Sequence, residues 1–140
     1  MTGVMVFLDT NVVVDLLRAR RPLVRERYAK MRNLGARLAL STIALFELRY
    51  GAANSDRAEQ NRRALDALLG ESFEIVAFDA DDAAEAGAIR AELQRSGKPI
   101  GPFDTLIAAQ ARRRGATLIT NDAREFGRVQ GLRVEDWASA

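Results

Sequence analysis

Short apolar runs alternate with longer amphipathic segments along this chain of 140 residues. Residues 4–8 (VMVFL) are uniformly apolar, as is typical of a parallel strand buried on both faces. The same reasoning predicts strands at residues 38–40, 73–78 and 117–120, with an edge strand at 132–134. Because helical segments separate these strands, we expect an α/β fold with a mostly parallel central sheet of about 4–5 strands and helices on both faces.

Helices are predicted between the strands from the spacing of apolar residues and from residues that start or stop helices. Pro22 is placed to begin one helix, and Gly35 and Gly70 are placed to end two others. Ser41 or Thr42 can cap the helix that follows the second strand. The predicted helices are residues 12–18, 23–34, 43–53, a long helix after the polar turn at 54–56 that ends at 69, 79–95 and 103–114.

Composition narrows the class of protein. The length is that of one domain, so residues 1–140 are expected to form a single domain. The 48% of hydrophobic residues fits a soluble globular protein, and no apolar run approaches the roughly 20 residues of a membrane span. The start, MTGVMVFLDTN, has no basic stretch before its apolar run and reads as a first strand. The chain has no cysteine, which agrees with a cytoplasmic location.

The absence of histidine and cysteine restricts the chemistry. A Ser-His-Asp hydrolase, a catalytic thiol and a metal centre with histidine or thiolate ligands are all excluded. Catalysis must then use carboxylates, hydroxyls, arginines and a bound metal. Of the 21 basic residues only Lys30 and Lys98 are lysines, which mainly indicates a biased genome composition. The net charge of +2 is too small for a nucleic-acid coat protein and suggests basic patches around an acidic pocket.

Four acidic residues far apart in the chain carry the functional prediction. Asp9, Glu47, Asp104 and Asp122 each lie at the carboxyl end of a predicted strand or just inside the helix that follows. An open α/β fold gathers these ends into one crevice. Carboxylates that close together repel one another unless a cation lies between them. A hard divalent ion such as Mg²⁺ or Mn²⁺, which prefers oxygen ligands, is the simplest candidate.

Each of these acids also has an ordinary structural role. Asp9 can cap a helix, although Asn11 competes for that position. Glu47 can lie on a solvated helix face, and Asp104 suits the first turn of a helix because of the helix dipole. Asp122 follows asparagine in a typical turn. Their joint placement is harder to explain in these terms and favours a shared site.

Two other charged clusters are better explained by helix structure. Asp79, Asp81 and Asp82 match the first turn of a helix, where they can cap it and interact with its dipole. Arg112–Arg114 could contact a phosphate backbone, but three cations at the end of a helix also suit the dipole, which is the interpretation we favour.

Four segments in order resemble one family. They are LDTNVVVDLL, STIALFELRYG, IRAELQRSGKPIGPFDTLIAAQARRRGATLITND and the terminal strand that ends near Trp137. Together they resemble the PIN-domain ribonucleases, in particular the VapC-type toxins of bacterial toxin–antitoxin pairs. The resemblance covers nearly the whole chain. Residues 18–37 and 54–71 carry no family signature, and substrate choice is expected to depend on them.

The resemblance implies a single PIN-like domain that hydrolyses RNA with one or two Mg²⁺ or Mn²⁺ ions. By position, it assigns the metal to Asp9, Glu47, Asp104 and Asp122, and supporting polar roles to Asn11 and Thr120. It further implies products with a 5′-phosphate and a 3′-hydroxyl, a growth-inhibiting effect, a VapB-like antitoxin that neutralises it, and a homodimer. The antitoxin is expected to lay its C-terminal segment along apolar helices and to place a basic side chain in the acidic pocket.

Three other interpretations remain open from the residues. A PIN fold could bind RNA or a partner without cleaving anything, although the complete set of acids argues against it. A receiver-like phosphoacceptor domain needs a lysine after a late strand, where neither Lys30 nor Lys98 lies. A haloacid-dehalogenase-like phosphatase usually has a second acid where this chain has Asn11. Metal-dependent cleavage, measured with a chelator control, distinguishes all of these.

Overall fold

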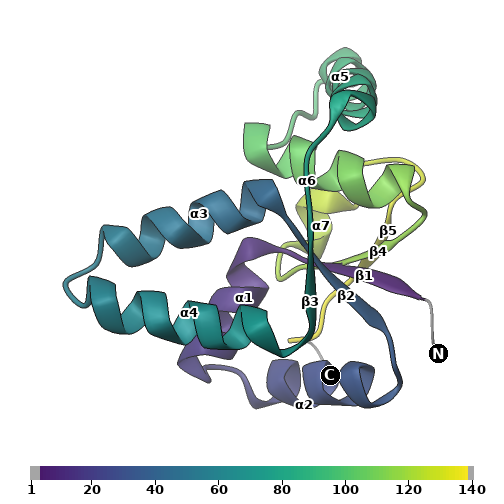
Figure 1. Cartoon of the computed structure of the whole chain (residues 1–140). Coiled ribbons are helices and arrows are strands. Elements are labelled where there is room, and N and C mark those ends of the chain that lie inside the picture. Colours follow the sequence, from purple (N-terminus) through teal and green to yellow (C-terminus); the bar gives the residue numbers. More distant parts are fainter. Residues whose placement is uncertain (1–3, 139–140) are drawn as a thin grey trace.

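The computed structural model describes residues 4–138 and has one sheet flanked by helices (Figure 1). Its strands are β1 (Met5–Leu8), β2 (Arg37–Ser41), β3 (Phe73–Val76), β4 (Thr117–Ile119) and β5 (Arg133–Glu135). Their order across the sheet is β3-β2-β1-β4-β5, and every neighbouring pair is parallel. The predicted α/β class and parallel sheet are therefore confirmed, including the edge strand near the end of the chain.

The helices also follow the prediction, with local differences. They are α1 (Thr10–Arg18), α2 (Pro22–Asn33), α3 (Thr42–Ala53), α4 (Ala58–Ser72), α5 (Ala80–Arg95), α6 (Pro102–Arg113) and α7 (Ala123–Phe126). The prediction that Gly70 ends a helix is wrong, because α4 continues past it to Ser72. Nothing lies within 4 Å of a Cβ built at Gly70, so this glycine only weakens the helix by about 1 kcal/mol. β3 ends at Val76 and not at Phe78, and α7 was not predicted.

The strand order creates a reversal point beside β1. The chain runs from β1 through β2 to β3 in one direction and then returns to β4 on the other side of β1. Right-handed crossovers, the general rule for parallel strands, place α1–α4 on one face and α5–α7 on the other. The packing agrees, because α1 contacts α2, α3 and α4, whereas α5 packs on α6 (Figure 1). Ligands of open α/β folds bind where the strand order reverses, which here is the carboxyl end of β1 and β4.

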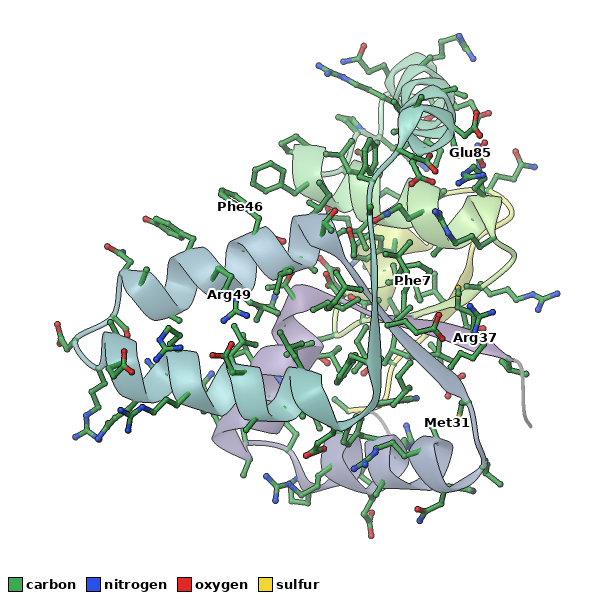
Figure 2. The ribbon with its side chains drawn as sticks, in the orientation of Figure 1. Phe7, Met31, Arg37, Phe46, Arg49 and Glu85 are labelled. Atoms are coloured by element: carbon green, nitrogen blue, oxygen red, sulfur yellow. The ribbon has the colours of Figure 1, made fainter. Side chains whose placement is uncertain are left out.

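The core is built from the two central strands and their neighbours. Fully buried side chains include Phe7, Leu8, Leu38, Leu40, Leu118 and Ile119. Figure 2 shows Phe7 in the middle of the molecule, beneath the helices, whereas Phe46 projects outward from α3. Burial on both faces explains why β1, β4 and the middle of β2 are mainly apolar, whereas the edge strands β3 and β5 carry exposed charged residues. No helix within residues 4–138 combines the length and the hydropathy needed to cross a membrane.

α5 is fastened to α6 by a network of charges around Asp82, whose side chain is fully buried. Asp79 caps α5, and Asp82 completes a reciprocal capping box with it, which confirms the predicted capping role of this cluster. The Asp82 carboxylate also accepts hydrogen bonds from Arg113 Nε at 2.8 Å and from Arg114 Nη1 at 2.7 Å. Arg112 Nε bonds Glu85 at 2.6 Å. These arginines therefore neutralise acids at the start of α5 and in its first turns, a structural role that the sequence had assigned to the helix dipole and not to ion pairs.

Candidate active site

Asp9 leaves the end of β1 directly at the reversal point. It is 6% exposed, and its Oδ1 accepts a hydrogen bond from the backbone N–H of Thr10 at 2.9 Å, so it also caps α1. Its other oxygen, Oδ2, accepts from the hydroxyl of Thr120 at 2.9 Å. Thr120 follows β4 and is fully buried, which joins the ends of the two neighbouring strands. Asp9 thus has its ordinary capping role and, at the same time, a fixed position in the crevice.

Glu47 reaches the crevice from α3. Its Oε1 accepts a hydrogen bond from the hydroxyl of Thr10 at 2.7 Å. Since Thr10 is next to Asp9 in the chain, this contact holds Glu47 close to Asp9, although the two are far apart in sequence. The sequence allowed Glu47 to lie on a solvated helix face. The structure instead leaves its side chain half-buried and bonded to Thr10.

Asp122 is connected to the same ends of the strands through Thr120. The Thr120 hydroxyl accepts a hydrogen bond from the backbone N–H of Asp122 at 3.0 Å while donating to Asp9. Asp122 is exposed and caps α7, where its Oδ1 accepts from the N–H of Glu125 at 3.3 Å. Glu125 turns back towards α6, and its Oε1 accepts from the N–H of Gly101 at 3.1 Å. This chain of contacts leads from β4 to the start of α6.

Asp104 lies in the first turn of α6, three residues after Gly101. A Cβ built at Gly101 would lie 3.2 Å from Asp104 Oδ2, which is closer than most such contacts in proteins. Glycine therefore leaves the space beside this carboxylate open. No cation pairs with Asp104 within residues 4–138, although its side chain is half-buried.

The electrostatics indicate that these carboxylates lie near one another. Burial raises the pKa of Asp104 to about 7, and the nearby charges of Asp9, Glu125, Glu47 and Asp122 add to the effect. Burial likewise raises the pKa of Asp9, where hydrogen bonds from Thr residues oppose it and the charges of Glu47 and Asp122 add to it. Carboxylates perturb one another in this way only within a short distance.

The donor set fits a hard divalent cation. All the candidate ligands are carboxylates, and the raised pKa of Asp104 means that an added positive charge would be stabilising. Within residues 4–138, no three carboxylates are already arranged to enclose an ion. Like charges without a cation between them repel one another, and of these acids Asp122 is exposed and Glu47 is half-buried.

Sequence reasoning missed two contributors and overstated one. Glu125 joins the acidic crevice, but α7 has only four residues and its position could not be inferred from periodicity. Thr10 positions Glu47, and its place beside Asp9 was the available signal. Asn11 is exposed and forms no hydrogen bond through its side chain in the described part of the chain, whereas Thr120 makes the contacts expected of a supporting residue.

A buried acid supports the loop after β4 from α1. Asp15 is 6% exposed, and its Oδ2 accepts a hydrogen bond from Asn121 Nδ2 at 2.8 Å. Arg21 Nε lies 3.3 Å from the same oxygen. Asn121 stands between Thr120 and Asp122, so Asp15 fixes the segment that carries both.

Comparison with known proteins gives one family. The PIN domain model matches residues 6–132. The chain is 42% identical to the tRNA(fMet)-specific endonuclease VapC of Shigella flexneri over 132 residues, which cover 94% of this chain and 96% of that protein. It is 39% identical to Ribonuclease VapC2 of Haemophilus influenzae, covering 93% of this chain and 96% of that protein.

Solved structures agree with this result. The crystal structure of VapBC2 from Rickettsia felis, bound to a DNA fragment from the promoter, contains a chain with a TM-score of 0.88 and 34% identity, covering 95% of this chain and 98% of that one. DNA-bound VapBC from Salmonella typhimurium gives a TM-score of 0.87 and 37% identity, covering 96% of this chain and 98% of that one.

Proposed function

Since the chain belongs to the PIN-domain family, we propose that it is an endoribonuclease that inhibits growth and is neutralised by an antitoxin. The acidic crevice at the ends of β1 and β4 is its active site. Relatives that cover nearly the whole chain are named ribonucleases and endonucleases, and the similar solved structures are of VapBC pairs. We place the protein in the cytoplasm, where RNA is available.

The proposed ligands of one or two Mg²⁺ or Mn²⁺ ions are Asp9, Glu47, Asp104 and Asp122. When bound, the metal would supply a water activated for attack and would neutralise charge on the phosphate. The chain has no histidine that could activate the water instead. Thr120 orients the Asp9 carboxylate and Thr10 orients the Glu47 carboxylate, each through a hydroxyl hydrogen bond. Hydrolysis of this kind leaves a 5′-phosphate on one product and a 3′-hydroxyl on the other.

The observation that carries the proposal is the crowding of carboxylates around Asp104, whose pKa rises to about 7 and which forms no ion pair with a cation of residues 4–138. Replacing it by asparagine removes one ligand at nearly constant shape. We expect Asp104→Asn to lose RNA cleavage while its circular dichroism spectrum stays that of the wild type. Cleavage by the wild type should need Mg²⁺ or Mn²⁺ and stop with a chelator. Full activity in Asp104→Asn would exclude the assignment, and no cleavage by the wild type with either metal would leave a binding protein as the function.

The first RNA to test is initiator tRNA. Two relatives, at 42% and 40% identity, are named tRNA(fMet)-specific endonucleases. We propose the same substrate class for this chain, with total RNA as the comparison. Sequencing of the new ends locates the cut, and ligation that requires a 5′-phosphate tests the proposed products. A cyclic phosphate at the new ends would contradict the hydrolytic mechanism.

A groove leads from the acidic crevice between α1, α3 and α4, and we propose that the antitoxin occupies it. The groove encloses about 160 Å³, and Thr10 and Glu47 form its inner end. The remaining lining comes from the three helices and is mainly apolar, including Val14, Leu17 and Leu65, with Arg18 and Asn61 as its polar members. An amphipathic segment can bury its apolar face in such a groove. A basic residue at its end would then meet the carboxylates.

Gly51 allows this proposal to be tested without touching the active site. It lines the groove on α3, is exposed, and has nothing within 4 Å of a built Cβ. Gly51→Phe should fill the groove, so that growth inhibition persists when the antitoxin is co-expressed. Gly70→Phe is the matched control, because Gly70 is an equally open helical glycine outside the groove. Equal neutralisation of both variants would rule out this groove.

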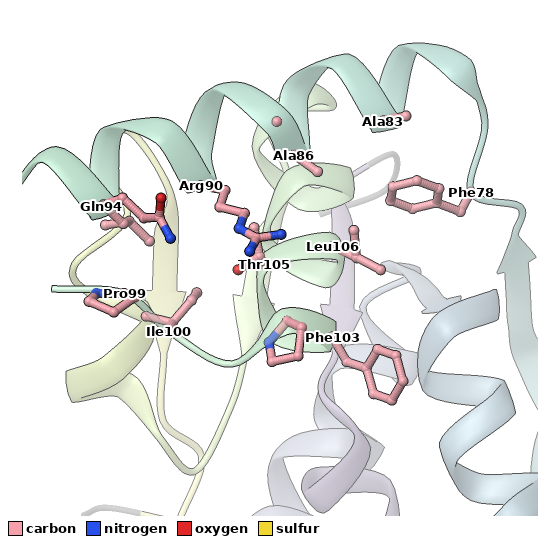
Figure 3. Close-up of a pocket in the computed structure, with 13 residues that line it drawn as sticks. Phe78, Ala83, Ala86, Arg90, Gln94, Pro99, Ile100, Phe103, Thr105 and Leu106 are labelled. Atoms are coloured by element: carbon pink, nitrogen blue, oxygen red, sulfur yellow. The ribbon is translucent and has the colours of Figure 1, made fainter.

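We further propose that the chain forms a homodimer through the face around Phe103. Phe46, Tyr50 and Phe103 are 57%, 61% and 42% exposed, and the Phe46 and Phe103 rings meet edge to face with centroids 5.8 Å apart. Beside them, α5 and α6 enclose a mainly apolar hollow of about 550 Å³ (Figure 3). Light scattering should give twice the chain mass for the wild type and a monomer for Phe46→Ser with Phe103→Ser. A wild-type monomer at micromolar concentration would contradict the proposal.

A further inference from the structure

An acidic crevice repels the phosphates of RNA, so the substrate needs positive charges nearby. This inference rests on the proposed cleavage of RNA. Arg112–Arg114, the candidates from the sequence, are unsuitable because they are paired with Glu85, Asp82 and Asp79. An arginine already bonded to a carboxylate has few donors left for a phosphate.

A second hollow, of about 510 Å³, lies between α7 and the loop that joins α5 to α6. Its charged lining consists of Lys98, Arg124 and Arg128, with Ser96 beside them and no carboxylate. All three cations are exposed. Within residues 4–138 none of them forms an ion pair with an acid, in contrast to the arginines at the end of α6.

Both walls of this hollow are attached to the active site. Arg128 Nη1 donates to the carbonyl oxygen of Pro99 at 3.1 Å, and Gly101 N–H donates to Glu125 Oε1 at 3.1 Å. These bonds hold the loop before Asp104 against the turn of α7. Arg124 and Arg128 are four residues apart in a continuous turn, so their side chains share one side of it. The cations are therefore positioned by the same two segments that carry acids of the crevice.

We propose that Lys98, Arg124 and Arg128 form a phosphate-binding subsite that holds the RNA backbone beside the nucleotide being cut. Arginine can bind phosphate through two parallel hydrogen bonds, and lysine adds a point charge. Another basic hollow at the opposite, amino end of the strands is lined by Arg37, Arg114 and Arg133. Two of those three arginines are already paired with acids, and the hollow is far from the ends of β1 and β4 that carry the crevice.

The test measures RNA binding separately from cleavage. Binding of fluorescein-labelled single-stranded RNA to Asp104→Asn protein is followed by anisotropy between low and moderate salt. Removing one cation that binds a phosphate should reduce the slope of log affinity against log salt by about 0.7. We expect Lys98→Ala, Arg124→Ala and Arg128→Ala each to weaken binding about fivefold and to reduce the slope by about 0.7, and the triple variant to reduce it by about 2.

Two variants control for general effects. Arg133→Ala removes an exposed arginine from the opposite end of the sheet and should leave the slope unchanged. Arg128→Lys keeps the positive charge but loses the guanidinium hydrogen bond to the carbonyl of Pro99. If the charge is what binds the phosphate, this variant should retain most of its affinity for RNA. In the otherwise wild-type enzyme, the alanine variants should raise KM more than they lower kcat.

The outcomes separate the subsite from the proposed function. An unchanged salt slope in the triple variant, or no measurable RNA binding at low salt, would overturn the subsite. So would a triple variant that binds RNA normally but is no longer neutralised by the antitoxin, because the hollow would then belong to a protein partner. Failure of the wild type to cleave any RNA with Mg²⁺ or Mn²⁺ would overturn the nuclease proposal, and the binding measurement would still decide the subsite.

Discussion

Removing the charge of Asp104 should stabilise the metal-free protein, and only above about pH 5. The carboxyl has a pKa of about 7 in the folded chain, against 3.8 when unperturbed. Ionisation is therefore easier in the unfolded chain, and folding loses stability as the pH rises from about 4 to 7. The full difference corresponds to about 4 kcal/mol, which solvent screening of a half-buried group reduces to about 2 kcal/mol. For a chain of this length, that is about 6 °C in melting temperature.

Thermal unfolding in the presence of a chelator measures this directly. At pH 4.5 the wild type and Asp104→Asn should melt within a degree or two of each other, and by pH 8.5 the variant should melt about 6 °C higher. Asp56→Asn, which removes an exposed acid from the turn between α3 and α4, should show no such divergence. Millimolar Mg²⁺ or Mn²⁺ should raise the melting temperature of the wild type at pH 8.5 and raise that of Asp104→Asn much less. Parallel pH curves for the wild type and Asp104→Asn, or no effect of metal on the wild type, would refute the reasoning.

Three further substitutions probe what surrounds the site. Gly101→Ala would place a methyl group 3.2 Å from Asp104 Oδ2, so we expect weaker binding of Mn²⁺ by calorimetry with little change in melting temperature. Asp15→Ala leaves the half-buried Asn121 without its acceptor; it should lose about 2 kcal/mol in urea unfolding and also bind Mn²⁺ less tightly, with partial recovery in Asp15→Asn. Asp82→Ala removes the carboxylate partner of Arg114 and leaves Arg113 paired with Asp79 alone; it should cost about 3–5 kcal/mol, while a protein that still folds in the cold should keep its affinity for the metal.

Most of the fold could be predicted because its signals are local. The three buried strands, β1, β2 and β4, contain short apolar runs, and helices alternate with the strands, which leaves few arrangements open. The failures are also physical. A glycine such as Gly70 is typical of a helix end. Here it faces open solvent, and α4 continues past it because tertiary packing outweighs the weak helix propensity of one glycine. The four residues of α7 are too few to show a period.

The site was predictable only in part, since its parts come from different levels of structure. The places of Asp9 and Asp122 after strands are visible in the sequence, and the rule for ligand sites in open sheets brings them together. The pairing of Glu47 with Thr10 depends on how α3 packs against the start of α1, which no local pattern reports. The position of Glu125 depends on the turn of α7 and on the loop at Gly101.

The chain divides its inward-facing acids into two kinds, and this division is the physical argument for the proposed active site. Asp82 is fully buried; burial alone would raise its pKa, but hydrogen bonds from Arg114 and Arg113 outweigh that effect and lower it. Asp104 is also withdrawn from solvent, but its charged neighbours in the crevice are acids, and its pKa is raised. The chain pairs one inward-facing carboxylate, that of Asp82, with two arginines, so a similar ion pair at Asp104 would have been possible. Asp9 instead has a hydroxyl and a backbone N–H as partners, and Asp104 has acids as its charged neighbours, so this arrangement costs stability that we expect a cation from solution to recover.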